Sequence, residues 1–196
     1  MIEKIAINIT NFICNTLDVD NDMRDIYQYG VEITISSFFN IFFVMLCAVV
    51  IADPYAGVMY LLVFIFLRLF CGGYHSTTYF RCNLTMIVTF LITYSIYWAF
   101  CYWKVSINTF EALSLINFIP IIAYAPVSNI HKPLAENDRK RCRIISIVLA
   151  SFFTFGAFVL VSMNVRYGLL IIVTLSAVSV MIIIEIFMQR RGYHKS

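Results

Sequence analysis

His75 and Cys82 lie seven residues apart in a short polar stretch, RLFCGGYHSTTYFRC, at residues 68–82. A cysteine becomes a strong nucleophile when it loses its proton, and a neutral histidine is a common acceptor for that proton. On one straight helix, seven residues correspond to a rise of about 10.5 Å, so the two side chains would share a face without touching. The pair can therefore act as nucleophile and base only if the chain folds back between them.

The residues around the pair permit such a fold-back. Gly72 and Gly73 relax the steric limits on the backbone, and the Ser-Thr-Thr stretch at residues 76–78 is typical of turns and helix starts. Cys82 would then lie near the N-terminus of the next helix, where free N–H groups and the helix dipole favour a thiolate. The neighbouring Arg81 adds positive charge with the same effect. Our hypothesis is that His75 is the base and Cys82 the nucleophile.

Three alternatives remain open at this point. Cys71 is a rival nucleophile four residues before His75, although it lies at the end of a hydrophobic segment and lacks the advantage of a helix start. Cys71, His75 and Cys82 are also possible metal ligands, but a fourth ligand is missing and the spacing matches no common zinc pattern. Finally, a His and a Cys in a polar loop commonly have no catalytic role.

Hydrophobic segments must position these residues. The chain has 196 residues, of which 61% are hydrophobic and 13% charged, whereas a soluble domain is nearer half apolar and a quarter charged. This surplus excludes a disordered, a fibrous and an ordinary cytosolic protein, because it must face lipid. The apolar runs are continuous rather than alternating, so they predict helices and not the strands of a barrel. We expect an all-α polytopic membrane protein, a single membrane domain over residues 1–196, with six transmembrane helices at Ile33–Ala52, Tyr55–Phe70, Leu84–Trp103, Thr109–Val127, Ile144–Met163 and Tyr167–Met188.

The N-terminal residues 1–17 predict a different kind of helix. Ile2, Ile5, Ile9, Phe12 and Ile13 recur at helical spacing, and polar residues occupy the positions between them. This pattern is typical of an amphipathic helix that lies in the membrane interface.

The distribution of basic residues predicts the orientation of the spans. Of the 14 Lys and Arg residues, which give a net charge of +3, only Lys104 and Arg166 lie in loops on one side. By the positive-inside rule the other side is cytoplasmic, and it includes both termini, residues 68–82 and residues 127–143. Beside membrane spans, basic clusters indicate orientation or contact with anionic lipid rather than nucleic acid. The twelve basic residues on the cytoplasmic side are Lys4, Arg24, Arg68, Arg81, Lys132, Arg139, Lys140, Arg141, Arg143, Arg190, Arg191 and Lys195.

The polar stretch at residues 68–82 resembles the signature of the accessory gene regulator B (AgrB) family, the membrane endopeptidases of Gram-positive quorum sensing. Members carry an Arg, a Gly pair, a His and, seven residues later, a Cys. The stretches DIYQYGVEI and YAPVSNIHKPL also resemble family segments, so the resemblance covers most of the chain. The residues that match the signature here are Arg68, Gly72, Gly73, His75 and Cys82.

Two features depart from the family pattern. Cys71 lies inside the signature and keeps the rival nucleophile open. The run of lysines expected in the basic loop at residues 127–143 is split into Lys132 and the Arg139–Arg143 cluster.

The resemblance implies a specific reaction on a small propeptide, AgrD. Such proteins cut off the C-terminal tail of the propeptide and close the upstream part into a thiolactone or lactone. Cys82 would attack a backbone carbonyl and form an acyl-enzyme thioester, with His75 transferring the proton. A Cys or Ser of the peptide would then attack the thioester and release the ring. No cofactor is implied, and the thioester exchange needs no ATP.

Other residues have weaker claims to a role in this site. Arg68, at the inner end of the second span, is either an interfacial anchor or a group that holds a substrate acid or the oxyanion. Glu32, at the inner end of the first span, is a candidate to pair with Arg68 or to orient His75. Lys132 and the basic cluster are candidates to bind an acidic propeptide tail, although topology explains them as well.

We therefore expect a cysteine endopeptidase of the cell membrane with an AgrD-like propeptide as its partner. A homodimer is compatible with the small volume that six short spans enclose. The main alternative is a membrane transporter or exporter of a small peptide without covalent chemistry, but the sequence shows no internal repeat of the kind common in transporters.

Overall fold

The computed structural model describes residues 2–17, 21–72, 79–127, 136–163 and 165–191. Within these ranges the secondary structure consists of helices, without a strand, which confirms the all-α prediction. The helices are α1 (Ile2–Leu17), α2 (Asn21–Val50), α3 (Pro54–Cys71), α4 (Tyr79–Tyr102), α5 (Ile107–Tyr124), α6 (Glu136–Ser162) and α7 (Tyr167–Arg190).

The helices α2 to α7 correspond to the six predicted spans. Among the described residues, five of them are long and apolar enough to cross a membrane: α2, α3, α4, α6 and α7. The chain is therefore a multi-pass membrane protein, although the count differs from the six spans that the sequence predicted. The difference concerns α5, whose apolar stretch Thr109–Tyr124 is shorter than the 18 residues of α3, the shortest of the five spans.

Three helices begin earlier than the apolar segments predicted. α2 begins at Asn21 rather than at residue 33, α4 begins at Tyr79 rather than at residue 84, and α6 begins at Glu136 rather than at residue 144. Hydrophobicity marks only the part of a helix that can face lipid, so it misses polar turns that continue the same helix. As a result, the Arg139–Arg143 cluster belongs to the first turns of α6 and not to a loop.

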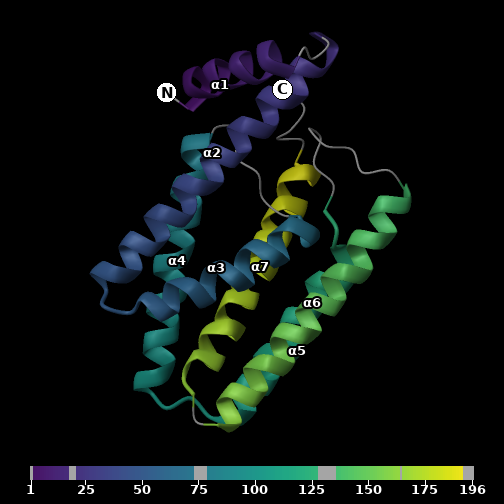
Figure 1. Ribbon diagram of the computed structural model, residues 1–196. Helices are drawn as coiled ribbons and strands as arrows, with labels where there is room; N and C mark the ends of the chain where they lie inside the picture. Colours follow the sequence, from purple (N-terminus) through teal and green to yellow (C-terminus); the bar gives the residue numbers. More distant parts are fainter. Residues whose placement is uncertain (1, 18–20, 73–78, 128–135, 164, 192–196) are drawn as a thin grey trace.

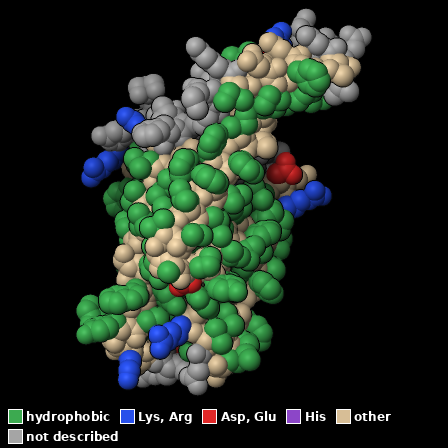
Figure 2. Space-filling view, turned by 60° about the vertical axis from the view of Figure 1, so that its left-hand side comes forward, with side chains coloured by type: hydrophobic (Ala, Val, Ile, Leu, Met, Phe, Trp, Pro, Cys, Tyr) green, Lys and Arg blue, Asp and Glu red, His purple; other side chains and the backbone are tan. Residues whose placement is uncertain are grey.

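α7 forms the centre of the bundle. It packs against α3, α4, α5 and α6, whereas α2 packs against α3 and α4 at one side (Figure 1). Connections between the helices alternate between the two ends of the bundle, so the C-terminal end of α7 lies at the same end as α1 (Figure 1). Hydrophobic side chains cover most of the face in Figure 2, with Lys and Arg toward its two ends, as a lipid-facing surface requires.

α1 lies across one end of the bundle and packs on α2 (Figure 1). Ala6 and Thr10 are buried, and Arg24 of α2 donates a hydrogen bond to the side chain of Asn11. Ile5, Ile9 and Phe12 stay exposed. This arrangement agrees with the amphipathic helix that the sequence predicted.

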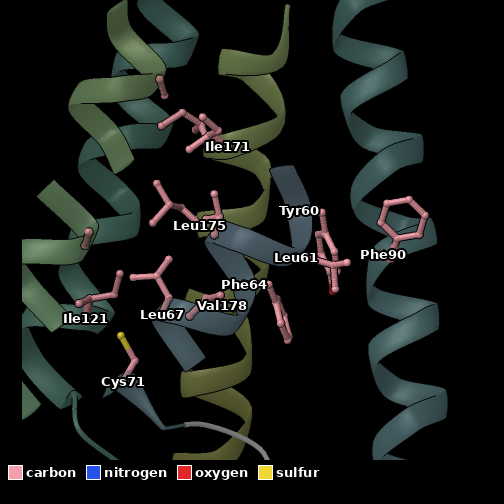
Figure 3. Packing of buried hydrophobic residues seen from close by; sticks show 14 of the residues in the cluster. Tyr60, Leu61, Phe64, Leu67, Cys71, Phe90, Ile121, Ile171, Leu175 and Val178 are labelled. Carbon is pink, nitrogen blue, oxygen red and sulfur yellow. The ribbon is translucent and has the colours of Figure 1, made fainter. Parts of the chain in front are cut away.

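The hydrophobic core lies where α3 crosses α7. Tyr60, Leu61, Phe64, Leu67 and Cys71 follow one another along α3, beside Leu175 and Val178 of α7 (Figure 3). In a membrane the lipid is as apolar as these side chains, so van der Waals packing rather than the hydrophobic effect favours their contact. The packing is close enough at Gly168 of α7 that a Cβ there would lie 2.5 Å from the backbone oxygen of Ala157 in α6.

Buried polar groups attach the short helix α5 to α7. Asn117 donates a hydrogen bond of 3.2 Å to the backbone oxygen of Ile172, and Ser179 donates one of 2.9 Å to the backbone oxygen of Asn117. Hydrogen bonds of this kind contribute to the association of helices in a membrane.

Candidate active site

The end of α3 carries a conformation that only glycine adopts easily. Gly72 follows Cys71 with φ of 71° and ψ of −147°, and its N–H donates a hydrogen bond of 3.2 Å to the carbonyl oxygen of Arg68. In this region of backbone space a Cβ causes steric strain. A Cβ would also lie 2.5 Å from the backbone oxygen of Val127. Gly72 is thus required both for the turn and for the close approach of another segment.

That other segment is the beginning of the connection between α5 and α6. The N–H of Val127 donates a hydrogen bond of 3.0 Å to the carbonyl oxygen of Cys71. The two polar stretches that the sequence separated by more than fifty residues therefore meet at this point. We call this contact the Gly72–Val127 junction, and we call this end of the bundle the site end.

Cys82 lies in the first turn of α4 and faces Arg68 of α3. The guanidinium Nη2 of Arg68 points to the Cys82 Sγ at 4.0 Å, and both side chains are half-buried. The Arg68 guanidinium also lies 5.6 Å from the centre of the Phe64 ring, which holds it by a cation–π contact. Beside Cys82, the side chain of Arg81 is exposed. Both the positive charge of Arg68 and the N-terminus of α4 can stabilise a thiolate at Cys82.

Asn83, which follows Cys82 in the chain, and its partner Ser36 were not singled out in the sequence. Ser36 of α2 donates a hydrogen bond of 2.8 Å to Oδ1 of Asn83. This bond attaches the first turns of α4 to α2. The residues are 47 positions apart, and no spacing rule could have paired them.

Glu32 lies one turn before Ser36 on α2. Its side chain is only 9% exposed, and Gln28 donates a hydrogen bond of 3.0 Å to its Oε1. Its pairing with Arg68 or His75 stays a prediction. A second acid, Glu185 of α7, is 2% exposed and accepts a hydrogen bond of 3.1 Å from Gln189.

Cys71 occupies a very different environment from Cys82. It has no exposed surface and belongs to the hydrophobic core. A substrate could not reach its sulfur without movement of the core.

Three residues of the predicted site lie outside the described residues: Gly73, His75 and Lys132. The proposed base and its distance from Cys82 are therefore not part of the described geometry. Over the ranges that are described, no group of three His, Cys, Asp or Glu side chains could hold a metal ion.

Comparison with known proteins adds independent information. The model of a protein family described as accessory gene regulator B matches residues 6–188. The chain is 26% identical over 161 residues to AgrB-like protein 2 of Clostridium perfringens (strain 13 / Type A), covering 79% of this chain and 75% of the relative. It is also 30% identical over 88 residues to accessory gene regulator protein B of Staphylococcus intermedius, covering 45% of each chain. No solved structure matches.

Proposed function

Because the chain belongs to the accessory gene regulator B family, we propose that it is a membrane cysteine endopeptidase that cleaves and cyclises a small AgrD-like propeptide. Cys82 is the nucleophile in this proposal, His75 the base, and Arg68 the group that stabilises the thiolate. The observation that carries the proposal is the contact of 4.0 Å between Arg68 and the Cys82 sulfur at the start of α4.

The position of this contact supports a catalytic assignment. A guanidinium 4.0 Å from the sulfur attracts a thiolate, and water weakens this attraction where it screens the two charges. Both side chains are half-buried, so screening is incomplete. An anchor that only snorkels would direct its guanidinium to water, whereas Arg68 directs it to the sulfur.

The proposed reaction proceeds in two balanced steps. In the first, the Cys82 thiolate attacks a backbone carbonyl carbon of the propeptide, and the peptide C–N bond breaks. The tail leaves as an amine that receives the proton that His75 took from the thiol, and the upstream peptide remains as a thioester on Cys82.

In the second step, a thiol or hydroxyl of the same peptide attacks the thioester carbonyl. A new C–S or C–O bond closes the ring, the bond to Cys82 breaks, and the proton of the attacking group passes through His75 to Cys82. Exchange of one thioester for another is nearly balanced in free energy, so a thiolactone forms without ATP. Exclusion of water at the membrane surface protects the intermediate from hydrolysis.

The proposal extends to orientation and partners. By the positive-inside rule we assign the site end and both termini to the cytoplasm of the cell. There, we assign the binding of an acidic propeptide tail to the exposed basic residues Arg139, Lys140 and Arg141 at the start of α6. Lys132 is assigned the same role. The amphipathic α1 is a surface on which an amphipathic part of the substrate can pair, and a homodimer would enlarge the enclosed volume.

The test uses the purified protein in lipid vesicles with a synthetic candidate propeptide, followed by mass spectrometry. We expect a thioester adduct on Cys82, release of the tail, and loss of both in Cys82→Ala. Cys71→Ala is the matched control, because it removes a thiol eleven residues away in the same region, and it should retain cleavage. Cleavage that persists in Cys82→Ala would refute the proposal. Unchanged peptide that crosses the vesicle membrane would identify a transporter instead.

A further inference from the structure

One carboxylate joins three helices at the end of the bundle opposite to the site. Asp53 precedes α3, and its Oδ1 accepts a hydrogen bond of 3.1 Å from the N–H of Ala56. The same oxygen accepts a bond of 2.9 Å from the hydroxyl of Tyr167 in α7, and Oδ2 accepts one of 3.5 Å from the hydroxyl of Tyr94 in α4. We call Asp53, Tyr94 and Tyr167 the Asp53 clasp.

The clasp does more than cap a helix. A cap needs one acceptor for the free N–H groups of the first turn, and Asp53 provides that with Oδ1. The two tyrosine hydroxyls are additional donors, and aromatic rings hold them in place. Tyr97 is 7% exposed. The centre of its ring lies 5.7 Å from that of Tyr94 and 6.3 Å from that of Tyr167, on which it stacks.

Two of the three helices that the clasp joins, α3 and α4, carry the site at their other ends. α3 bears Arg68 and α4 bears Cys82, and the two side chains approach to 4.0 Å. A change in the relative tilt of α3 and α4 would change this separation. Between the two ends, Tyr60 of α3 lies against α4. Its ring centre is 5.1 Å from that of Phe90, and its hydroxyl donates a bond of 3.4 Å to the backbone oxygen of Met86 (Figure 3).

We infer that Asp53 is a positioning residue: its clasp with Tyr94 and Tyr167 sets the tilt of α3 against α4 and thereby holds Arg68 beside the Cys82 sulfur. The inference rests on the proposed role of Cys82. It assigns a function in the reaction to a carboxylate at the far end of the same helix.

Helix geometry gives the size of the effect. Asp53 precedes Tyr60 by seven residues and Arg68 follows Tyr60 by eight, so the two arms of α3 measure about 10.5 and 12 Å. If α3 pivots at its contact with Phe90, a displacement of 1 Å at the clasp therefore moves Arg68 by about 1.1 Å. A misplacement of about 1 Å caused by a remote change can cost about a hundredfold in rate.

The experiment measures the reactivity of Cys82 directly, in the full-length protein in lipid vesicles. Iodoacetamide alkylates thiolates, and mass spectrometry of the Cys82 peptide gives the rate across a range of pH. An increase in the Arg68–Cys82 separation from 4 to 5 Å weakens the attraction between the guanidinium and a thiolate and slows alkylation near neutral pH about fourfold. We expect this slower alkylation in Asp53→Asn, together with a fall in kcat for propeptide cleavage of about tenfold or more and a KM within twofold.

Two further variants separate positioning from simple loss of stability. Tyr167→Phe removes one hydroxyl donor but keeps the cap and the ring stacking, so it should also slow alkylation even if Asp53→Asn folds poorly. Ser106→Ala is the matched control, because Ser106 caps α5 at the same end of the bundle and has no bond to α4 or α7 among its described contacts. It should lower the unfolding temperature and leave alkylation and kcat within twofold.

The outcomes distinguish this inference from the proposed function. The positioning role of Asp53 would be overturned if folded Asp53→Asn and Tyr167→Phe were alkylated like the wild type, or if Ser106→Ala changed alkylation equally. An inactive Cys82→Ala would still support the proposed cysteine endopeptidase in that case. Full cleavage by Cys82→Ala would overturn the enzyme mechanism, but slower alkylation in Asp53→Asn would still show the mechanical link.

Discussion

Replacement of Gly72 by alanine tests whether the Gly72–Val127 junction forms the site. A non-glycine residue at φ of 71° and ψ of −147° costs about 1–3 kcal/mol. The new Cβ would lie 2.5 Å from the Val127 backbone oxygen, so the hydrogen bond of 3.0 Å from Val127 to Cys71 must also break or stretch, at a cost of about 0.5–1.5 kcal/mol. The sum of about 1.5–4.5 kcal/mol reduces the equilibrium constant for forming the junction roughly 10- to 2000-fold.

The assay compares Gly72→Ala with Gly156→Ala in propeptide cleavage and in thermal unfolding. Gly156 lies within α6, where a Cβ would meet nothing within 4 Å, so alanine there should preserve activity and raise stability slightly through its better helix propensity. We expect Gly72→Ala to lose at least tenfold in cleavage and to unfold at a lower temperature.

A Gly72→Ala protein that cleaves and unfolds like the wild type would refute the reasoning. It would mean that cleavage does not require the close approach of the end of α3 to the backbone of Val127.

Three other changes have defined outcomes. Gly168→Ala should lower the unfolding temperature, because its Cβ would lie 2.5 Å from the backbone oxygen of Ala157, and an unchanged temperature would contradict the close crossing of α6 and α7. Asn117→Leu removes the 3.2 Å bond to the backbone oxygen of Ile172 and should cost about 0.6–1.7 kcal/mol in reversible unfolding, with stabilisation as the opposite result. Arg68→Gln removes the charge that faces the thiol of α4 and should slow alkylation of that thiol at neutral pH by about tenfold or more, whereas an unchanged rate would reduce Arg68 to an interfacial anchor.

Much of the fold followed from local patterns in the sequence. The runs at Tyr55–Phe70 and Tyr167–Met188 predicted α3 and α7 to within two residues, because a stretch of apolar residues between polar ends has the length that a bilayer requires. The periodicity of residues 1–17 predicted α1. The boundaries were less accurate where polar turns extend a helix beyond the bilayer, as at the starts of α2, α4 and α6.

The candidate site was predictable only in part. Residue types, spacing and the family resemblance together singled out Arg68, Gly72 and Cys82, and the structure brings the first and the last of these together. The spacing could not separate Cys71 from Cys82 as nucleophile, since that choice depends on burial.

What the amino-acid sequence determined by itself is therefore the set of helices, their approximate lengths and the residue types at the ends of each. Only the tertiary structure decided which faces meet: Arg68 against Cys82, Gly72 against Val127, and Asp53 against two tyrosines from distant helices. The physical reason is that a helix in lipid is apolar on nearly every face, so hydrophobicity marks its depth but not its neighbours. Close packing and a small number of polar contacts select those neighbours, and they exist only once the helices have assembled.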